Sequence, residues 1–376
     1  MANNTVAVPN GVNWQPADLN VWLTTQPPAL DYLFENMFPC GIIAGLGGSG
    51  GIGKSTFALQ LAYSLASGTI VFEDFVPTRP ASVLVFLGED PANVTWQRIF
   101  SINRCFPLTS EQERELKNNL VVYSDKAAPL CISKEGQIKP TQHYSWMKSR
   151  VQALQPKLII IDPKARWSTG NENSNDDATA FVNLLQSLAQ PSNASVLVTH
   201  HVSKARKDTL DVSSSRGASA FPDATRLFFS MVRCSSNGSD ANGEQEVLIH
   251  TTKSNFTPRL PKPLVLRHST EHGGIFEQMP ESESSQVVLV ATCLAEWLSD
   301  NGPMNLSAIR DPRDEQANQL KCFMEERCGS YRKYLDAAIE AGEAQGLLAV
   351  ESVSTGGRKA RQVSAIQDDA VENNVI

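Results

Sequence analysis

The amino-acid sequence predicts an α/β protein with a mostly parallel sheet, followed by a small α+β module. Through most of the chain, short apolar strand patterns alternate with helical patterns, which is typical of parallel sheets covered by helices on both faces. Beyond about residue 286, helical patterns are instead followed by two strand patterns. This change in order predicts two structured parts.

The chain is expected to begin with a flexible arm, residues 1–26, because this stretch is polar and weakly patterned. The apolar run at 42–44 then predicts a buried strand that ends at a glycine-rich loop. In the helix predicted after the loop, apolar residues recur on one face, and Gly68 is a suitable C-terminal stop. These apolar residues are Phe57, Ala58, Leu61, Ala62 and Leu65.

Further apolar runs predict the rest of the main sheet. The predicted strands lie at 83–87, 120–123, 158–161, 196–199 and 247–251. A helical pattern at 178–189 separates two of them. The later strands, including 227–232, follow one another closely, so we expect them to be antiparallel. The domain built from all these elements is predicted to span residues 27–277.

A polar, serine-rich run predicts a linker at residues 278–286. Three helices are expected at about 286–300, 313–327 and 330–346. Two strands follow, LLAVESV and KARQVSAI. Helices followed by a two-stranded hairpin predict a winged-helix-like module over residues 287–366, and residues 367–376 are expected to form a disordered tail.

Composition excludes some classes of protein. The 376 residues carry a net charge of −7, which argues against a basic surface that coats nucleic acid but is compatible with a local basic channel. No apolar run approaches the roughly 20 residues that span a bilayer, and the first forty residues lack Lys and Arg, so we expect neither a membrane segment nor a signal peptide. The seven cysteines form no C-x-x-C pair, which favours a reducing, cytoplasmic location.

The glycine-rich stretch AGLGGSGGIGKST, residues 44–56, fits two motifs. In the first, Gly48, Gly53, Lys54 and Ser55 match the phosphate-binding pattern G-x-x-x-x-G-K-[ST]. The predicted strand before the stretch and the helix after it are the context that a true phosphate loop requires.

The second motif is the nucleophile turn of a hydrolase. Gly47, Ser49 and Gly51 match G-x-S-x-G, and Asp162 and His200 follow in the chain order of that fold. However, a nucleophilic serine of this kind leads straight into its helix, whereas here further glycines prolong the loop. The lysine and serine that end the phosphate motif would also have no role, so we favour the phosphate interpretation.

The phosphate interpretation predicts an ATP site. Successive glycines let backbone N–H groups turn around a phosphate, and the following helix N-terminus adds its dipole. Lys54 would supply charge to the β- and γ-phosphates, and the Ser55 hydroxyl would ligate Mg²⁺. The predicted ATP-binding residues are Gly48, Ser49, Gly50, Gly51, Ile52, Gly53, Lys54, Ser55 and Thr56.

Two acidic residues extend this chemistry. The strand KLIIIDP ends in Asp162, a position from which a carboxylate orients Mg²⁺, so Ser55 and Asp162 are the predicted metal-side residues. The strand VLVFLGEDP ends at Glu89, which we expect to polarise the attacking water if its strand neighbours the phosphate loop. The alternatives are an ordinary strand-end aspartate and a solvated turn before Pro91.

Seven stretches resemble the RepA-type hexameric replicative helicases of plasmids, which are RecA-like P-loop ATPases related to the DnaB-like helicases. In chain order they are PPALDYLF, GGSGGIGKSTFALQLA, VFLGEDP, IIIDPKARW, VTHHVSKA, SSRGASA and TTKSNFTP. The phosphate loop alone is generic, but the ordered combination with Glu-Asp-Pro, His-His-x-Ser-Lys and Ser-Arg-Gly-x-Ser is more specific. The resemblance implies that residues 27–277 are a RecA-like ATPase domain, with ATP bound between adjacent subunits of a ring.

The resemblance also implies catalytic roles. Lys54 and Glu89 would act in hydrolysis, and either His200 or His201 would sense the γ-phosphate, with His200 placed among the catalytic candidates. Because adjacent strand residues point to opposite faces, we do not expect the two histidines to share a metal. One would act as a polar switch and the other would pack.

An arginine finger is a further implication of the resemblance. Arg216 matches the position from which such a residue would reach the neighbouring subunit's ATP and stabilise transition-state charge. DnaB-like helicases carry Lys-x-Arg in a late strand, whereas the segment Lys253-Ser254-Asn255 lacks the arginine. Arg216 is therefore the expected finger, and Lys253 would assist in trans. Without the resemblance, a solvated charge is the simpler interpretation of Arg216.

The segment after the histidines is the predicted DNA-binding loop. Lys204, Arg206 and Lys207 make it basic, although Asp208 and Asp211 offset part of the charge. In a single subunit this is an ordinary solvated loop. Repeated around a ring and facing the pore, it would track the phosphates of single-stranded DNA. The loop contains no aromatic residue, so contacts would be to the backbone and independent of sequence.

The motifs predict an ATP- and Mg²⁺-dependent enzyme, and the resemblance implies a homo-hexameric translocase or helicase that acts on single-stranded DNA in plasmid, phage or mobile-element replication. One alternative is a regulatory RecA-like ATPase that binds DNA without unwinding it, and another is a switch that binds a protein partner. In the C-terminal module, Arg358, Lys359 and Arg361 are candidates for phosphate contacts. Docking to a replication initiator or primase is the competing interpretation of that module.

Overall fold

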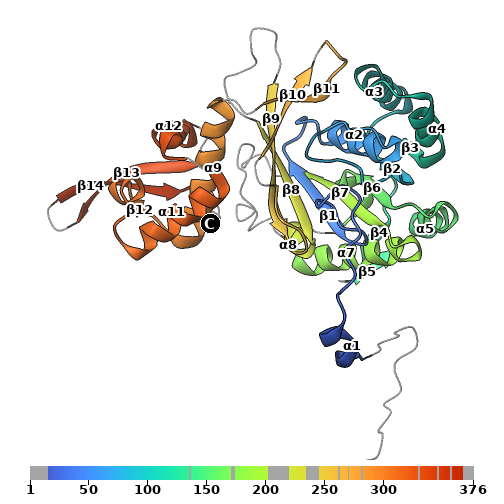
Figure 1. Ribbon diagram of the computed structural model, residues 1–376, viewed down its shortest axis with the longest axis horizontal. Helices are drawn as coiled ribbons and strands as arrows, with labels where there is room; N and C mark the ends of the chain where they lie inside the picture. The colour runs from blue at the N-terminus through green and yellow to red at the C-terminus, as the bar shows by residue number, and fades with distance from the viewer. Residues whose placement is uncertain are drawn as a thin grey trace, which may run out of the picture. The chain divides into compact units, whose positions relative to one another are not determined.

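The computed structural model describes residues 16–134, 137–170, 174–201, 220–233, 245–260, 263–269, 271–280, 283–328, 331–344, 347–355 and 358–366. It confirms the predicted α/β architecture, a large, mostly parallel sheet with helices on both faces (Figure 1). The chain divides into two compact units, Met1–Asp31 and Tyr32–Ile376.

The main sheet has nine strands in the order β11-β10-β9-β8-β1-β7-β6-β2-β3. The strands are β1 (Ile43–Gly48), β2 (Val83–Leu87), β3 (Leu120–Ser124), β6 (Leu158–Asp162), β7 (Ser195–His201), β8 (Leu227–Arg233), β9 (Gln245–Ser254), β10 (Leu264–Ser269) and β11 (Ile275–Gln278). From β3 to β8 along this order all neighbours are parallel, whereas β9, β10 and β11 are antiparallel. The strand that leads into the glycine loop, β1, lies in the middle of this order.

The direction of β8 differs from the prediction. We expected residues 227–232 to belong to an antiparallel set, but β8 is parallel to β1, with Ala44 opposite Leu227, and antiparallel only to β9. An apolar run marks a buried strand without encoding its direction, because direction depends on the partners that the chain finds.

Helices bury both faces of the sheet. Those of one face are α2 (Lys54–Ser67), α3 (Ala92–Cys105) and α4 (Ser110–Asn119), and those of the other are α5 (Gln142–Leu154) and α7 (Asn175–Ala189). Along β1, Ala44 and Leu46 join the core of the α2 face, and Ile43 joins the other core. The five apolar residues predicted for one face of α2 are all buried. Gly68 ends α2 with φ +76° and donates its N–H to Ser64, as predicted.

Several short elements were not predicted from the sequence. They are the hairpin of β4 (Cys131–Lys134) and β5 (Gln137–Pro140), and the short helices α6 (Lys164–Trp167), η1 (Gln190–Ser192) and α8 (Ala220–Ala224). Their runs are too short for a periodicity of 2 or 3.6 to be recognised.

The described residues of the first unit, 16–31, form one short helix, α1 (Leu19–Thr24), within the predicted flexible arm. Asp18 caps it by accepting a hydrogen bond from the Asn20 backbone N–H at 3.0 Å. Large apolar side chains on α1 face solvent, and Trp22 and Leu23 are 70% and 83% exposed. Residues 1–15 of the predicted arm lie outside the described residues.

The C-terminal part is the predicted small α+β module. Its elements are α9 (Glu283–Asn301), β12 (Met304–Asn305), α10 (Leu306–Arg310), α11 (Glu315–Cys328), η4 (Tyr331–Tyr334), α12 (Leu335–Ala344), β13 (Leu348–Thr355) and β14 (Arg358–Ala365). The strands form an antiparallel sheet in the order β12-β14-β13, and Leu294, Leu320 and Ile339 lie in a core that the module builds for itself.

The predicted linker, residues 278–286, overlaps structured elements. Gln278 is the last residue of β11, and α9 already begins at Glu283. The predicted tail at 367–376 lies outside the described residues. In the described part of the chain, no helix is both long and apolar enough to cross a membrane.

Candidate functional site

The candidate site lies where β1 ends and α2 begins. Gly51 and Gly53 adopt φ +75° and +101°, a conformation that other residues rarely tolerate. No atom of the described residues lies within 4 Å of a Cβ built on Gly50 or Gly51, so this stretch of backbone faces open space. A Cβ on Gly53 would lie 2.4 Å from the ring of Phe276 in β11, so Gly53 also permits close packing. The loop therefore presents bare backbone, as a phosphate cradle requires.

Lys54, the first residue of α2, folds over this loop. Its Nζ donates hydrogen bonds to the backbone oxygens of Gly48 and Ser49, at 2.8 and 2.9 Å. Burial lowers the pKa of Lys54 to about 8, although the charges of Asp162 and Glu89 act in the opposite direction. A cation this poorly solvated is suited to bind an anion, because the added negative charge would stabilise its protonated form.

Asp162 ends β6 on the same side of the sheet. It is 3% exposed, and burial raises the pKa of its carboxyl group. Thr199 Oγ1 donates a hydrogen bond to Asp162 Oδ1, and the Ser55 side chain also hydrogen-bonds this carboxylate. A buried carboxylate next to a hydroxyl is an oxygen-rich set that fits Mg²⁺. The structure thus brings together Ser55 and Asp162, the two predicted metal-side residues.

Glu89 follows β2. The role predicted for Glu89 assumed that its strand lies next to the strand of the phosphate loop, and this is not the case. Two strands, β7 and β6, separate β2 from β1. Nevertheless, the Glu89 carboxylate is close enough to act electrostatically on Lys54. Its Oε1 accepts a hydrogen bond from Arg166 Nε of α6 at 2.8 Å, and both side chains are partly exposed. Glu89 therefore faces the loop from across the site and is accessible to water.

The two histidines at the end of β7 lie on opposite faces of the sheet. His201 Nδ1 is 3.2 Å from Lys54 Nζ. His200 is 2% exposed, its ring centroid is 5.6 Å from that of Phe221, and its Nε2 has no hydrogen-bond partner among the described residues. Burial, followed by the charge of Lys164, lowers the pKa of His200 to about 3. The geometry therefore favours His201 over His200 as the histidine that reaches the phosphate loop.

The structure does not form the Ser-Asp-His arrangement that the hydrolase alternative requires. Asp162 hydrogen-bonds Thr199, and the next residue along β7, His200, points to the other face of the sheet. Asp162 therefore cannot orient His200, and Ser49 has no histidine base from this pair.

The structure places Lys253 but not the other predicted DNA-binding or trans-acting residues. Its Nζ donates hydrogen bonds to the backbone oxygens of Pro222, at 3.2 Å, and of Asp223 in α8. Burial lowers the pKa of Lys253, partly offset by the charge of Asp223. The remaining predicted residues, Lys204, Arg206, Lys207 and Arg216, lie outside the described residues.

Sequence reasoning missed three residues that support the site. Thr199 hydrogen-bonds Asp162, Arg166 pairs with Glu89, and Gln60 joins α2 to β11. Arg166 and Thr199 stand close to predicted site residues in the sequence, in IIIDPKARW and VTHH, and this adjacency was an available signal. No such adjacency could have pointed to Gln60, because its partner Phe276 is distant in the chain.

A phosphate loop at the end of a central strand, a buried carboxylate beside its serine and a mostly parallel sheet covered by helices define a P-loop ATPase. Residues 14–207 match the protein family described as AAA domain. The match covers just over half of the chain, and the protein therefore belongs to this family of ATPases. Among solved structures, a KaiC-like protein from the hyperthermophilic archaeon Pyrococcus horikoshii is similar, with a TM-score of 0.44 and 14% identity, over 68% of this chain and 100% of that chain. A structural similarity this low says nothing about function.

Proposed function

We propose that this ATPase is a ring-forming motor, a hexameric translocase or helicase that moves on single-stranded DNA in plasmid, phage or mobile-element replication. The observation that supports the proposal most is the contact between His201 and Lys54. It joins the phosphate loop to the end of β7, and the chain continues from there into the basic segment of Lys204, Arg206 and Lys207. Loss of the γ-phosphate would thus act on Lys54, then on His201 through their contact, and then on the basic segment that follows His201 in the chain.

The residues present fit ATP and Mg²⁺. The open backbone around Gly50 and Gly51 would hold phosphate oxygens, and Lys54 would exchange its two carbonyl partners for them. Ser55 and Asp162 would hold Mg²⁺, which when bound neutralises negative charge on the β- and γ-phosphate oxygens. Because burial raises the pKa of Asp162, a cation at this position would also stabilise the carboxylate form.

Glu89 is the proposed general base. Its partly exposed carboxylate would accept a hydrogen bond from the attacking water and orient it for in-line displacement. Arg166 holds Oε1 of this carboxylate at 2.8 Å and would fix its direction. His201 would then sense whether the γ-phosphate is present, since its ring already contacts the lysine that binds that group.

Assembly into a ring would serve two features of the chain. The exposed apolar side chains of α1, including Trp22 and Leu23, would be buried against a neighbouring subunit. Arg216 would reach the ATP of the adjoining subunit as the arginine finger, and Lys253 would assist from β9. Lys253 would have to release its contacts with α8 for this role.

The first experiment measures steady-state ATP hydrolysis with and without a single-stranded oligonucleotide, with Lys54→Ala as the blank. Stimulation by the strand that the blank lacks, followed by strand displacement on a forked duplex, is the expected result. Lys204→Ala plus Lys207→Ala should weaken strand binding and flatten its salt dependence. Unchanged affinity and salt slope in this double variant would contradict the proposed DNA contact.

A regulatory ATPase is the second candidate, favoured by the net charge of −7. It would bind DNA and hydrolyse ATP without unwinding, or would dock a replication initiator or primase through the C-terminal module. Strand-stimulated hydrolysis without displacement supports the first form. Hydrolysis indifferent to DNA contradicts the motor and supports the second form.

A further inference from the structure

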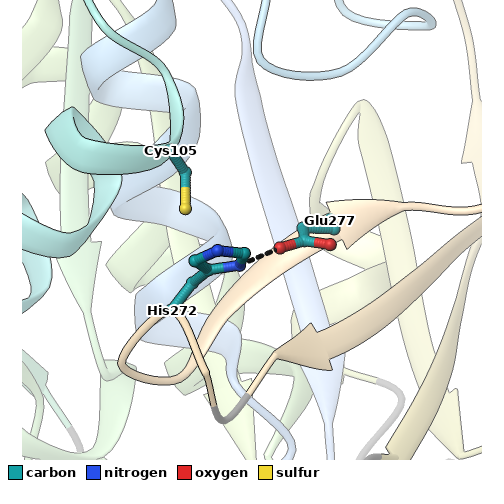
Figure 2. Close-up of side chains that lie close together, drawn as sticks. All are labelled: Cys105, His272 and Glu277. Carbon is teal, nitrogen blue, oxygen red and sulfur yellow. Dashed lines mark hydrogen bonds and ion pairs between the residues drawn. The ribbon is translucent and has the colours of Figure 1, made fainter.

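A group of metal-ligating side chains lies apart from the nucleotide site. Cys105 is the last residue of α3, His272 lies in the turn between β10 and β11, and Glu277 is in β11 (Figure 2). One ligand atom from each residue lies within 4.8 Å of the other two. The thiol points towards the imidazole ring, and His272 Nδ1 is hydrogen-bonded to Glu277 Oε1 (Figure 2). Ser269 Oγ is 3.0 Å from the same nitrogen.

We propose that Cys105, His272 and Glu277 bind a thiophilic divalent cation, with Zn²⁺ as the best fit. Thiolate, imidazole and carboxylate are the three side-chain ligand types that Zn²⁺ takes. At bond lengths of about 2.0–2.3 Å, tetrahedral ligands lie roughly 3.5 Å apart. Cys105 therefore needs to approach the other two ligands by about 1 Å, while the hydrogen-bonded pair of His272 and Glu277 opens so that the ion fits between them. Both shifts lie within the reach of side-chain rotation, and water fills the fourth position.

The local charge suits a dication. A Cys105 thiolate and the Glu277 carboxylate together balance two positive charges, and His272 binds as a neutral ring. Glu271 adds a further negative charge near the thiol, whereas Arg104 opposes it. The ion replaces the direct hydrogen bond between His272 and Glu277, so neither side chain is left without a partner.

The backbone of the hairpin holds His272 against α3. Gly273 and Gly274 both adopt positive φ, +72° and +78°, which makes the turn tight. A Cβ on Gly273 would lie 2.3 Å from Ser101 Oγ, so the turn packs directly on α3. The Gly274 N–H donates to the Ser269 oxygen at 2.8 Å and closes the turn. The position of the ligands is thus set by backbone packing, which is the preorganisation that a metal site needs.

The site joins two elements that flank the phosphate loop. α3 begins directly after Glu89-Asp90-Pro91. On the other side, the Phe276 backbone exchanges two hydrogen bonds with Gln60 of α2, at 2.8 and 2.9 Å. A cation held by α3 and the hairpin therefore cross-links both sides of the nucleotide site, and its role is to stabilise the fold there.

The test uses the full chain, stripped of metal and kept in excess Mg²⁺ so that the nucleotide site does not take up the probe. Co²⁺ is titrated first, because a tetrahedral thiolate site gives it visible d–d bands and a thiolate charge-transfer band. We expect one equivalent of Co²⁺ per chain, its displacement by Zn²⁺, and a rise of several degrees in Tm with Zn²⁺. Cys105→Ser and His272→Gln should each abolish the charge-transfer band and the Tm shift, and Glu277→Gln should weaken binding about 10- to 100-fold.

Two matched controls separate this site from other thiols and imidazoles. Cys322 and His143 are both exposed, so Cys322→Ser and His143→Gln should leave the Co²⁺ spectrum and the Zn²⁺ shift unchanged. Circular dichroism confirms that each variant is folded. A charge-transfer band that survives Cys105→Ser, or a wild-type chain that binds no Co²⁺ with a thiolate spectrum, overturns the proposal.

Discussion

His200 and His201 are neighbours in β7, yet they lie in opposite environments. The side of His201 carries Lys54, Asp162 and the open glycine loop, whereas the side of His200 carries Phe221 and other buried apolar side chains. Since side chains alternate along a strand, a shift of one position exchanges a group that contacts the phosphate loop for one that only packs. Residue type alone therefore does not identify the histidine that contacts the phosphate loop. The face of the sheet on which the side chain lies identifies it.

The largest effect on the catalytic side should come from Glu89→Gln. Glutamine keeps the size of the side chain but cannot accept a proton from water, so we expect kcat for ATP hydrolysis to fall by about 10²–10⁴-fold. Nucleotide binding, measured separately by fluorescence titration, should persist. Arg166→Gln is the matched comparison, because it removes the same ion pair but leaves the carboxylate, so kcat should fall much less than in Glu89→Gln. Hydrolysis at the wild-type rate in Glu89→Gln would assign the general base elsewhere.

The histidine comparison itself is tested by paired leucine substitutions. His201→Leu removes the contact with Lys54 and should lower hydrolysis by about 10²-fold, the effect of losing one polar group aimed at a reacting phosphate. His200→Leu should leave hydrolysis within a few fold, because the ring reaches no site residue. Steady-state kinetics on both variants measures the difference. The opposite ranking would restore His200 as the catalytic histidine.

A third test compares two glycines of the loop. Gly53→Ala places a Cβ 2.4 Å from the Phe276 ring at φ +101°, so we expect a loss of about 3 kcal/mol in the free energy of unfolding and weakened nucleotide binding. Gly50→Ala meets no atom of the described residues within 4 Å and should change stability by less than about 1 kcal/mol. Urea unfolding of both variants gives the comparison. Equal losses would mean that Phe276 moves aside.

Much of the fold follows from sequence patterns. The predicted strand 83–87 coincides with β2, and 158–161 and 196–199 fall within β6 and β7, because strands buried on both faces are continuous apolar runs. The predicted strand 120–123 falls within β3, an edge strand whose residues are only half-buried but are also apolar. The direction of β8 does not follow, since it depends on pairing with β1. The helices α3, α4 and α5 went unassigned as individual elements, because α3 and α5 bury few side chains and α4 buries none.

The residues of the candidate site also divide into those that local motifs predict and those that depend on long-range packing. Lys54, Ser55 and Asp162 follow from short motifs, because one loop and one strand end bring them together. The choice between the two histidines depends on the register of β7 against β6, which no local pattern encodes. The cluster of Cys105, His272 and Glu277 joins segments far apart in the chain, and only the packing of a hairpin turn on α3 brings it together.

The smallest expected effect is a difference between wild type and His200→Leu in how the free energy of unfolding depends on pH. The pKa of His200 is about 3 in the folded protein, below its unfolded value of about 6.5, so below pH 6.5 the unfolded chain takes up a proton that the folded chain does not. The stabilisation is complete above pH 6.5 and is lost progressively as the pH falls towards 3. At pH 5 the loss is about 2 kcal/mol. His200→Leu removes it, so the variant should equal wild type near pH 7.5, where the unpartnered Nε2 contributes little, and exceed it at pH 5.

Urea unfolding at both pH values measures this difference between the two proteins. The raised pKa of Asp162 acts with the opposite sign, because acid stabilises a fold that binds that proton more tightly, but it is common to both proteins and cancels in the comparison. His250, whose pKa burial lowers to about 4, cancels in the same way. His201→Leu is the matched variant, because it replaces the neighbouring histidine on the opposite face of the same strand. If His201→Leu flattened the pH profile and His200→Leu did not, the two faces of β7 would have been assigned the wrong way round.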